Sequence, residues 1–433
     1  MIQRTGVAVV RQKLRSMQRG QAFLVVTAGL VALLGIGALA IDVGVLWSTR
    51  RQMQSAADAG AMAGADAIAI SASTANVTSS AKVATAQNGF TDGSSTTRSS
   101  STVSVAVYNP PQSGPFATNS NAVEVTVKQT QPTYFMRVLG WTGVPVTTDA
   151  VAITVSGGSC VYALDPSNPG AVTVAGTGNL NSQCGIYDNS DNSSAALTVS
   201  GGGTIQAPLV GVVGGTNVNG GGSTPPSTGI AAFGDPLAWV PEPTVPTCSS
   251  YSTLNISTSQ TLYPGEYCGG LKLNAGASVV FSPGTYIMNG GGLTVVGGAT
   301  ASGSSVTFFL TGANKASSNP SSYGGVNIAS GANVTFNAPC SSGSGGIEGM
   351  LFFQDRSIPI GDGVGSTING SSTSTFNGAL YFPSTLLSYS GSSGSGFTLL
   401  VSYDLTINGT TSIGSNYSCL SNGSLIKNAA LVQ

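Results

Sequence analysis

Residues 22–41, AFLVVTAGLVALLGIGALAI, form a run of twenty residues without a charged side chain. As an α-helix with a rise of about 1.5 Å per residue, this run spans about 30 Å, the thickness of a bilayer's hydrocarbon core. The charged residues that precede it are all basic: Arg4, Arg11, Lys13, Arg15 and Arg19. The positive-inside rule therefore predicts a cytoplasmic basic leader at 1–21, a transmembrane helix at 22–41 and export of everything after residue 42.

Three fates of this helix stay open. Its length favours a retained single-pass anchor. A small-residue pattern that ends at Ala40 fits signal-peptide cleavage before Ile41, although the apolar run exceeds the roughly 7–15 residues usual in such peptides. A basic leader that ends at Gly20 fits prepilin-type cleavage before Gln21. The glutamate that is common at the fifth position of such mature chains is Val25 here.

The composition excludes several classes of function. The 433 residues include no histidine, so Ser-His-Asp and Cys-His hydrolase sites and HExxH zinc sites are ruled out. Lys and Arg number 15 against 16 Asp and Glu, so the chain lacks the basic stripe that nucleic-acid binding needs. With 60 glycines and 41% hydrophobic residues, the composition is typical of a surface protein rich in β-structure and turns.

The residues after the membrane segment predict a helical stalk and linker at 42–100, because alanine dominates the first part of this stretch. Ala56, Gly60 and Gly64 lie four residues apart and give the helix a face of small side chains. We expect that face to pack on its own domain or, as the alternative, on another helix. The Asp42 carboxylate is expected to be solvated at the membrane edge or paired with a neighbour's cation.

A small α/β region is predicted at 101–156. Alternating valines indicate strands at 103–107 and 123–127, and a third strand is expected at 144–155. Pro132 can open a short helix with Tyr134, Phe135, Val138 and Leu139 on one face, and Gly140 ends it.

Motifs within residues 19–69 occur in one register. They are Arg19-Gly20-Gln21, the apolar helix, Ala40-Ile41-Asp42-Val43-Gly44, and Arg50-Arg51-Gln52-Met53-Gln54 running into Ala56-Ala57-Asp58-Ala59. In this arrangement the segment resembles the amino-terminal Tad domain of TadG-like proteins, which belong to the TadE/TadG group of Flp pilus-assembly proteins of the tight-adherence system. Residues 123–152 are similar to the region that lies after the Tad domain in the same family. The resemblance implies a bacterial cell-envelope protein connected with pilus assembly.

Residues 157–433 are predicted to form a large β-solenoid, similar to a parallel β-helix. Short apolar-x-apolar triplets, each succeeded by glycine, recur, as at 172–174, 197–199, 293–295 and 405–407. Each triplet is too short to be a stable strand alone, and glycine supplies a tight corner, so stacked coils would bury the apolar side chains. A glycine-rich insert is expected near 211–247. An all-β sandwich is the alternative fold.

Six cysteines lie beyond the membrane segment: Cys160, Cys184, Cys248, Cys268, Cys340 and Cys419. An even number on the exported side predicts disulfides. Loop closure favours neighbours, so we expect Cys160 with Cys184, Cys248 with Cys268, and Cys340 with Cys419. The absence of CxxC pairs and of histidine argues against a zinc site.

Catalysis, metals and cofactors are not expected. The one condensed charged set, Glu348, Asp355, Arg356 and Asp362, is more typical of a surface ion pair or a strand-end cap than of a glycosidase. Asp188, Asp191 and nearby asparagines offer oxygen ligands for calcium, but an Asn/Asp-rich turn is the simpler interpretation.

These observations predict a membrane-anchored, exported structural or accessory component of Flp pilus assembly or surface attachment. Its expected partners are the inner membrane and other pilus-assembly or pseudopilin proteins. The alternative is a surface adhesin that uses the Tad domain only as an anchor, with Tyr323, Tyr389 and Tyr403 stacking on glycans. A polysaccharide-degrading β-helix enzyme is a further, weaker alternative.

Overall fold

The computed structural model describes residues 5–69, 73–94, 102–219, 222–313, 321–360, 364–369, 373–391, 396–421 and 423–432. Two compact units are present: unit 1 combines Met1–Val155 with Lys427–Gln433, and unit 2 is Ser156–Ile426. The chain is mainly β, with one long apolar helix at its amino-terminal end and a large region of parallel strands. This coarse fold class matches the sequence-based expectation.

Unit 1 combines two helices with a four-stranded sheet in the order β1-β2-β3-β31. The helices are α1 (Thr5–Ala69) and α2 (Thr74–Gln87), and a short 3₁₀ turn, η1 (Met136–Leu139), comes after β2. The strands are β1 (Ser104–Tyr108), β2 (Ala122–Pro132), β3 (Gly143–Ser156) and β31 (Lys427–Leu431). The alternating valines and the Gly140 stop thus produce the strands and the turn that the sequence predicts.

The last third of α1 forms the core of unit 1 together with α2 and β2. Met53, Ala56 and Ala61 are fully buried in one cluster with Val123 and Val125 of β2. The small-residue face of the helix therefore packs on its own domain.

Glycine is required on this face of α1. A Cβ on Gly60 would lie 2.6 Å from Cγ2 of Thr85, and one on Gly64 would lie 2.9 Å from Cγ1 of Val123. Both distances are far below ordinary carbon contact distances, so a larger side chain would force α1 away from α2 at Gly60 and away from β2 at Gly64.

Strand β31 corrects the sequence-based boundary at the end of the chain. Residues 427–432, expected to belong to the carboxy-terminal β region, complete the sheet of unit 1 instead, and the amide of Val432 donates to the carbonyl oxygen of Val151 at 3.0 Å. Unit 2 is thus inserted between two neighbouring strands of unit 1. Its ends meet, because the amide of Gly157 donates to the carbonyl oxygen of Ile426 at 2.7 Å.

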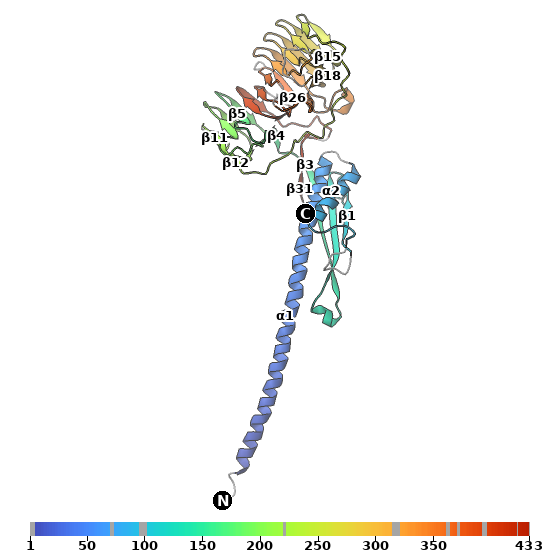
Figure 1. Ribbon diagram of the computed structural model, residues 1–433, viewed down its shortest axis with the longest axis vertical. Helices are drawn as coiled ribbons and strands as arrows, with labels where there is room; N and C mark the ends of the chain where they lie inside the picture. The colour runs from blue at the N-terminus through green and yellow to red at the C-terminus, as the bar shows by residue number, and fades with distance from the viewer. Residues whose placement is uncertain are drawn as a thin grey trace. The chain divides into compact units, whose positions relative to one another are not determined.

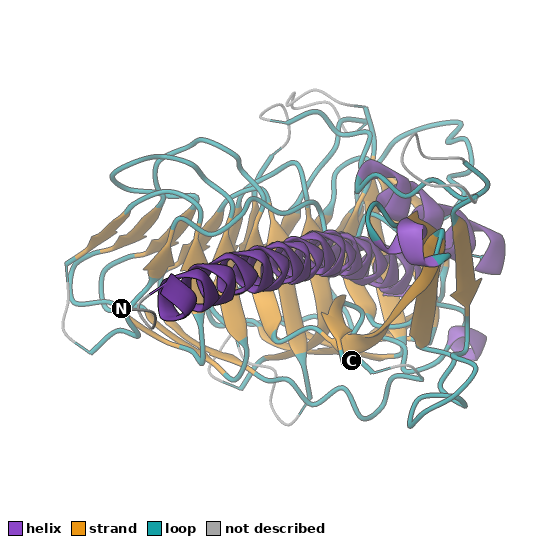
Figure 2. Ribbon diagram, turned by 90° about the horizontal axis from the view of Figure 1, so that it is seen from below, coloured by secondary structure: helices purple, strands orange, loops and turns teal. Residues whose placement is uncertain are grey.

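Unit 2 is built from short parallel strands. A ten-stranded sheet contains, in order, β11 (Thr216–Val218), β8 (Leu197–Val199), β5 (Val172–Val174), β29 (Leu405–Ile407), β27 (Leu387–Tyr389), β25 (Ser366–Ile368), β22 (Val326–Ile328), β19 (Leu293–Val295), β16 (Leu271–Leu273) and β13 (Leu254–Ile256). The four repeated triplets of the sequence all lie in this sheet. Figure 2 shows short strands side by side in a long row, without distinguishing the sheets.

A fourteen-stranded sheet divides into two arms at β26. Its common part is β12 (Ser227–Thr228), β10 (Val210–Val212), β7 (Gly185–Asp188), β4 (Ser159–Ala163), β28 (Thr398–Ser402) and β26 (Thr375–Phe382). One arm is β23 (Asn333–Asn337), β20 (Thr300–Ser304), β17 (Ser278–Phe281) and β14 (Gln260–Leu262). The other arm is β24 (Met350–Gln354), β21 (Val306–Thr311), β18 (Gly284–Asn289) and β15 (Gly265–Cys268). A three-stranded sheet joins β30 (Thr410–Ile413), β6 (Asn179–Ser182) and β9 (Thr204–Gln206).

Gly378 makes the bend at which the arms separate. Its φ of 136° lies where residues with a Cβ are strained, and a Cβ there would lie 2.5 Å from Cβ of Ala338. Before this glycine β26 pairs with β23, and after it with β24 and β28.

The strand order of unit 2 does not follow the chain. The final strands β28, β29 and β30 pair with the first ones, β4, β5 and β6 (Figure 1). The segment near 211–247, expected to be an insert, contributes β11 and β12, which extend the sheets at one end. The strand pairs of unit 2 with a described register are all parallel, which argues against the antiparallel sandwich.

The interior of unit 2 contains a ladder of stacked aromatic rings. Tyr286, Phe308 and Phe352 occupy matching positions on β18, β21 and β24, and successive ring centroids lie 5.4 Å apart. All three side chains are fully buried. Such contacts between neighbouring strands stabilise the stack beyond the gain from burial alone.

Candidate membrane-proximal site

The amino-terminal part of α1 presents an apolar surface. Among the described residues, α1 is the helix that is long and apolar enough to cross a membrane, by length and composition. Large side chains such as Leu33 and Ile36 are exposed on it. Both candidate cleavage positions, Gly20–Gln21 and Ala40–Ile41, lie within this continuous helix.

Asp42 comes directly after the apolar segment and is 2% exposed. Its carboxylate accepts three backbone hydrogen bonds, from the amides of Tyr134 (2.9 Å), Phe135 (2.9 Å) and Met136 (2.6 Å). The carboxylate is therefore not solvated, which corrects that expectation, and its hydrogen bonds among the described residues come from backbone amides. Backbone amides at the start of a tight turn suit this role, because their N–H groups point the same way and stabilise a negative charge.

The comparisons with known proteins agree with this arrangement. Residues 20–67 match the TadE/G-like Flp pilus-assembly family (Tad), and residues 57–152 match the Tad-like Flp pilus-assembly family (Tad_C). Residues 20–152, called the Tad region below, thus match two Tad-type pilus-assembly families. The resemblance seen in the sequence is thereby confirmed over these residues. No curated protein and no solved structure matches the chain.

Further contacts fix α1 of the Tad region to the β2–β3 hairpin. The Thr49 hydroxyl donates to the side chain of Gln131 at 3.2 Å, and the Gln54 amide donates to the carbonyl oxygen of Asp149 at 3.0 Å. Together with Asp42, these contacts hold the hairpin alongside the helix. Sequence analysis could not find them, because the partners are 82 to 95 residues apart.

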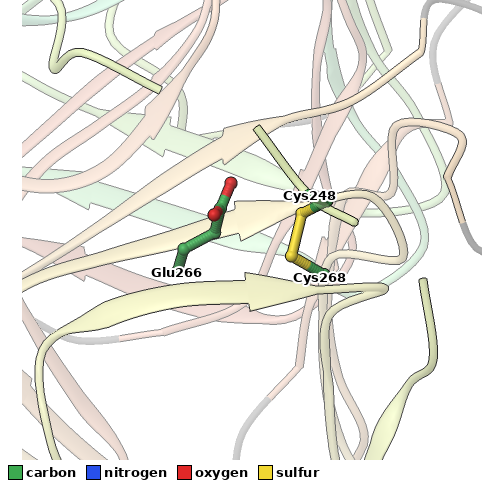
Figure 3. Close-up of side chains that lie close together, drawn as sticks. All are labelled: Cys248, Glu266 and Cys268. Atoms are coloured by element: carbon green, nitrogen blue, oxygen red, sulfur yellow. A yellow bond between two sulfur atoms is a disulfide. The ribbon is translucent and has the colours of Figure 1, made fainter. Parts of the chain in front are cut away.

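Outside the Tad region, the structure joins the six cysteines as neighbours along the chain. The disulfides are Cys160–Cys184, Cys248–Cys268 and Cys340–Cys419, with Cα–Cα distances of 5.7, 5.8 and 5.2 Å. Cys248 and Cys268 lie beside the Glu266 carboxylate in a grouping that resembles a metal site (Figure 3). Because their sulfurs are bonded to each other, they are not thiolate ligands.

The charged residues Glu348, Asp355 and Arg356, singled out from the sequence, make structural contacts in unit 2. The Arg356 guanidinium donates to the Tyr381 hydroxyl and to the carbonyl oxygens of Leu237 and Val240, and it forms an ion pair with Glu242 at 3.5 Å. These bonds hold the segment between β12 and β13, two strands that lie at opposite ends of the sheets.

The acidic members of this set are also occupied. Asp355 accepts from the amide of Ser357 at 2.7 Å, as a strand-end cap does, and Glu348 accepts from the amide of Ser421 at 2.7 Å. Asp362 lies outside the described residues.

The expected Asn/Asp-rich turn is present at residues 188–195. Asp188 accepts from the amide of Ser190 at 3.0 Å, and Asn192 accepts from the amides of Ser194 and Ala195. Asp191 is exposed. The side-chain oxygens of this segment therefore organise the backbone of the turn, as such residues commonly do.

The glycan-stacking interpretation fails at two of its three tyrosines. Tyr389 is fully buried and Tyr323 is 3% exposed, so neither ring can stack on a sugar. Tyr403 is partly exposed. Burial raises the pKa of Tyr403 to about 12, with the Asp165 carboxylate adding to the effect.

Asp188 lies in a region of like charge. Burial, together with the charges of Asp404 and Asp165, raises the pKa of Asp188 to about 6. Burial also raises the pKa of Asp404 to about 6, again with a contribution from Asp165. One oxygen of each of these three carboxylates has no hydrogen-bond partner among the described residues. Ionisation of Asp188 and Asp404 therefore destabilises the folded state.

This cluster predicts that stability falls as the pH rises from about 4 through about 6. The folded state binds more protons than the unfolded state in this window, so deprotonation favours unfolding. Asp188→Asn removes one charge, and we expect the free energy of unfolding to rise by about 1–2 kcal/mol at pH 7.5, because a shift of about two pKa units is worth about 3 kcal/mol at most. Urea denaturation at pH 4.5 and 7.5 measures this effect.

The matched control is Asp191→Asn, which removes an exposed charge from the same turn and should leave stability unchanged at both pH values. At pH 4.5 the gain from Asp188→Asn should shrink. An equal loss of stability at both pH values would show that the Asp188 carboxylate is a stabilising hydrogen-bond acceptor rather than a buried repulsive charge.

Proposed function

We propose that this protein is a membrane-anchored, exported structural component of Flp pilus assembly. The observation that carries the proposal is the match of residues 20–152 to two pilus-assembly families, one of which includes the exposed apolar part of α1. The basic residues before that segment support a cytoplasmic leader. The three disulfides support an oxidising compartment for unit 2.

We infer further that unit 2 is a β-solenoid displayed outside the cytoplasm. The triples β16-β17-β18 and β19-β20-β21 are consecutive along the chain and pair strand by strand in parallel register. The triple β16-β17-β18 pairs with β13-β14-β15 before it and with β19-β20-β21 after it, as the coils of a solenoid do. The aromatic ladder and the corner glycines support the same architecture.

The mature amino terminus of the protein, purified from the membrane fraction of the source bacterium, tests the anchor. A chain that begins near Met1 and resists alkaline extraction supports a retained helix. A start at Gln21 would replace the anchor with prepilin-type processing, and a start at Ile41 would indicate a released protein. Deletion of the gene should reduce piliation or adherence, and unchanged piliation, adherence and secretion would contradict the role in assembly.

A further inference from the structure

The tip of the β2–β3 hairpin, residues 133–142, exposes apolar side chains. Val138 is 87% exposed, Leu139 78% and Trp141 62%, and Tyr134 and Phe135 are also exposed. The sequence placed four of these side chains on one face of a short helix, and that face is not covered by the rest of unit 1. Five large apolar side chains within eight residues are unusual on a water-facing loop.

This tip lies beside the membrane segment of α1. Phe135, Val138 and Leu139 line an apolar groove of about 860 Å³ together with helix residues 31–41. Figure 1 shows the hairpin running along α1 to η1 at its tip. The Asp42 contacts fix this position, because they bind the first amides of the tip to the residue directly after the apolar segment.

The depth of the tip can be derived from helix geometry. Residues 31–41 span about 15 Å of helix, which is about half of a hydrocarbon core of about 30 Å. A helix that crosses the membrane with residues 22–41 therefore places the tip at the level of the outer leaflet.

We propose that the hairpin tip is a second membrane contact that inserts into the outer leaflet beside α1. This inference rests on the proposed function, since it requires α1 to span the bilayer. The occupant of the tip's surface is lipid, because that surface is continuous with the exposed helix flank at Leu33 and Leu34, which faces acyl chains. Tyr134 and Trp141 are the residue types enriched at membrane interfaces, and exposed Arg137 can reach phosphate groups.

The test uses the full chain with Trp141 as its only tryptophan, obtained by Trp47→Phe and Trp239→Phe. The protein is reconstituted into vesicles of phosphatidylcholine and phosphatidylglycerol that carry bromine on the acyl chains. Flotation measures anchoring, and quenching of Trp141 by bromine measures insertion of the tip. We expect the protein to float and Trp141 fluorescence to fall about twofold, since the ring lies at the interface.

Two variants in this background sharpen the result. Val138→Glu with Leu139→Glu should abolish the quenching while flotation stays unchanged. The matched control is Val83→Glu, which adds a charge at another exposed valine, on α2, and should leave the quenching intact.

The outcomes separate the tip from the anchor. Flotation without quenching of Trp141 would overturn the tip contact and leave the anchor standing. A blue-shifted but unquenched Trp141 would also overturn it, because a protein surface would then cover the tip. Failure to float would overturn the anchor, and the tip contact with it.

Discussion

Asp42→Ala is expected to release the β2–β3 hairpin from α1. The substitution removes the acceptor of three backbone hydrogen bonds, with distances of 2.6 to 2.9 Å, and leaves three amides without a partner. Hydrogen bonds to a charged group are stronger than those between neutral groups, so we expect the tip to lose much of its local stability. Hydrogen exchange measured on peptides that cover residues 133–142 should accelerate at least about a hundredfold.

Two variants of α1 distinguish the contact from a general effect of charge. Asp58→Ala removes a carboxylate whose side chain accepts from Gln54 on the same helix at 2.8 Å, and exchange in the tip should not change. Asp42→Asn keeps one acceptor oxygen, and its effect should be intermediate. If Asp42→Ala left the exchange rates of Tyr134, Phe135 and Met136 unaltered, the carboxylate would not be what holds the hairpin.

The strands of unit 2 could be predicted from sequence because their signals are local. An apolar-x-apolar triplet with a glycine after it specifies a short strand and a corner within a few residues, and the triplets at 172–174 and 405–407 became β5 and β29. The pairing order could not be predicted. Because the triplets are nearly interchangeable, nothing in them indicates that the last strands pair with the first ones.

The membrane segment was equally visible in the sequence, because twenty uncharged apolar residues have few alternatives in water. The site around it was not. Asp42 and the amide of Met136 are 94 residues apart, and a backbone amide carries no residue-specific signal. The same reason hid strand β31, whose partner β3 is separated from it by the whole of unit 2.

Removal of the Cys340–Cys419 disulfide is expected to have the second large effect. The bridge joins residues 79 positions apart, and constraining a loop of that length in the unfolded chain is worth about 4.5 kcal/mol. Cys248–Cys268 closes 20 positions, for which the same relation gives about 3.3 kcal/mol. Both Cys340 and Cys419 are exposed, so serine replacements leave no cavity, and the loss reports chain entropy directly.

Urea denaturation of the full chain with Cys340→Ser and Cys419→Ser measures this loss, and Cys248→Ser with Cys268→Ser is the matched control. The longer loop should cost about 1 kcal/mol more than the shorter one. Cys160 and Cys184 make a poorer comparison, because both are buried and their replacement adds a packing defect. The loop between Cys340 and Cys419 contains β24 to β30, of which β28 pairs with β4. If the free energy of unfolding fell less than in the control, these strands would stay ordered in the unfolded chain.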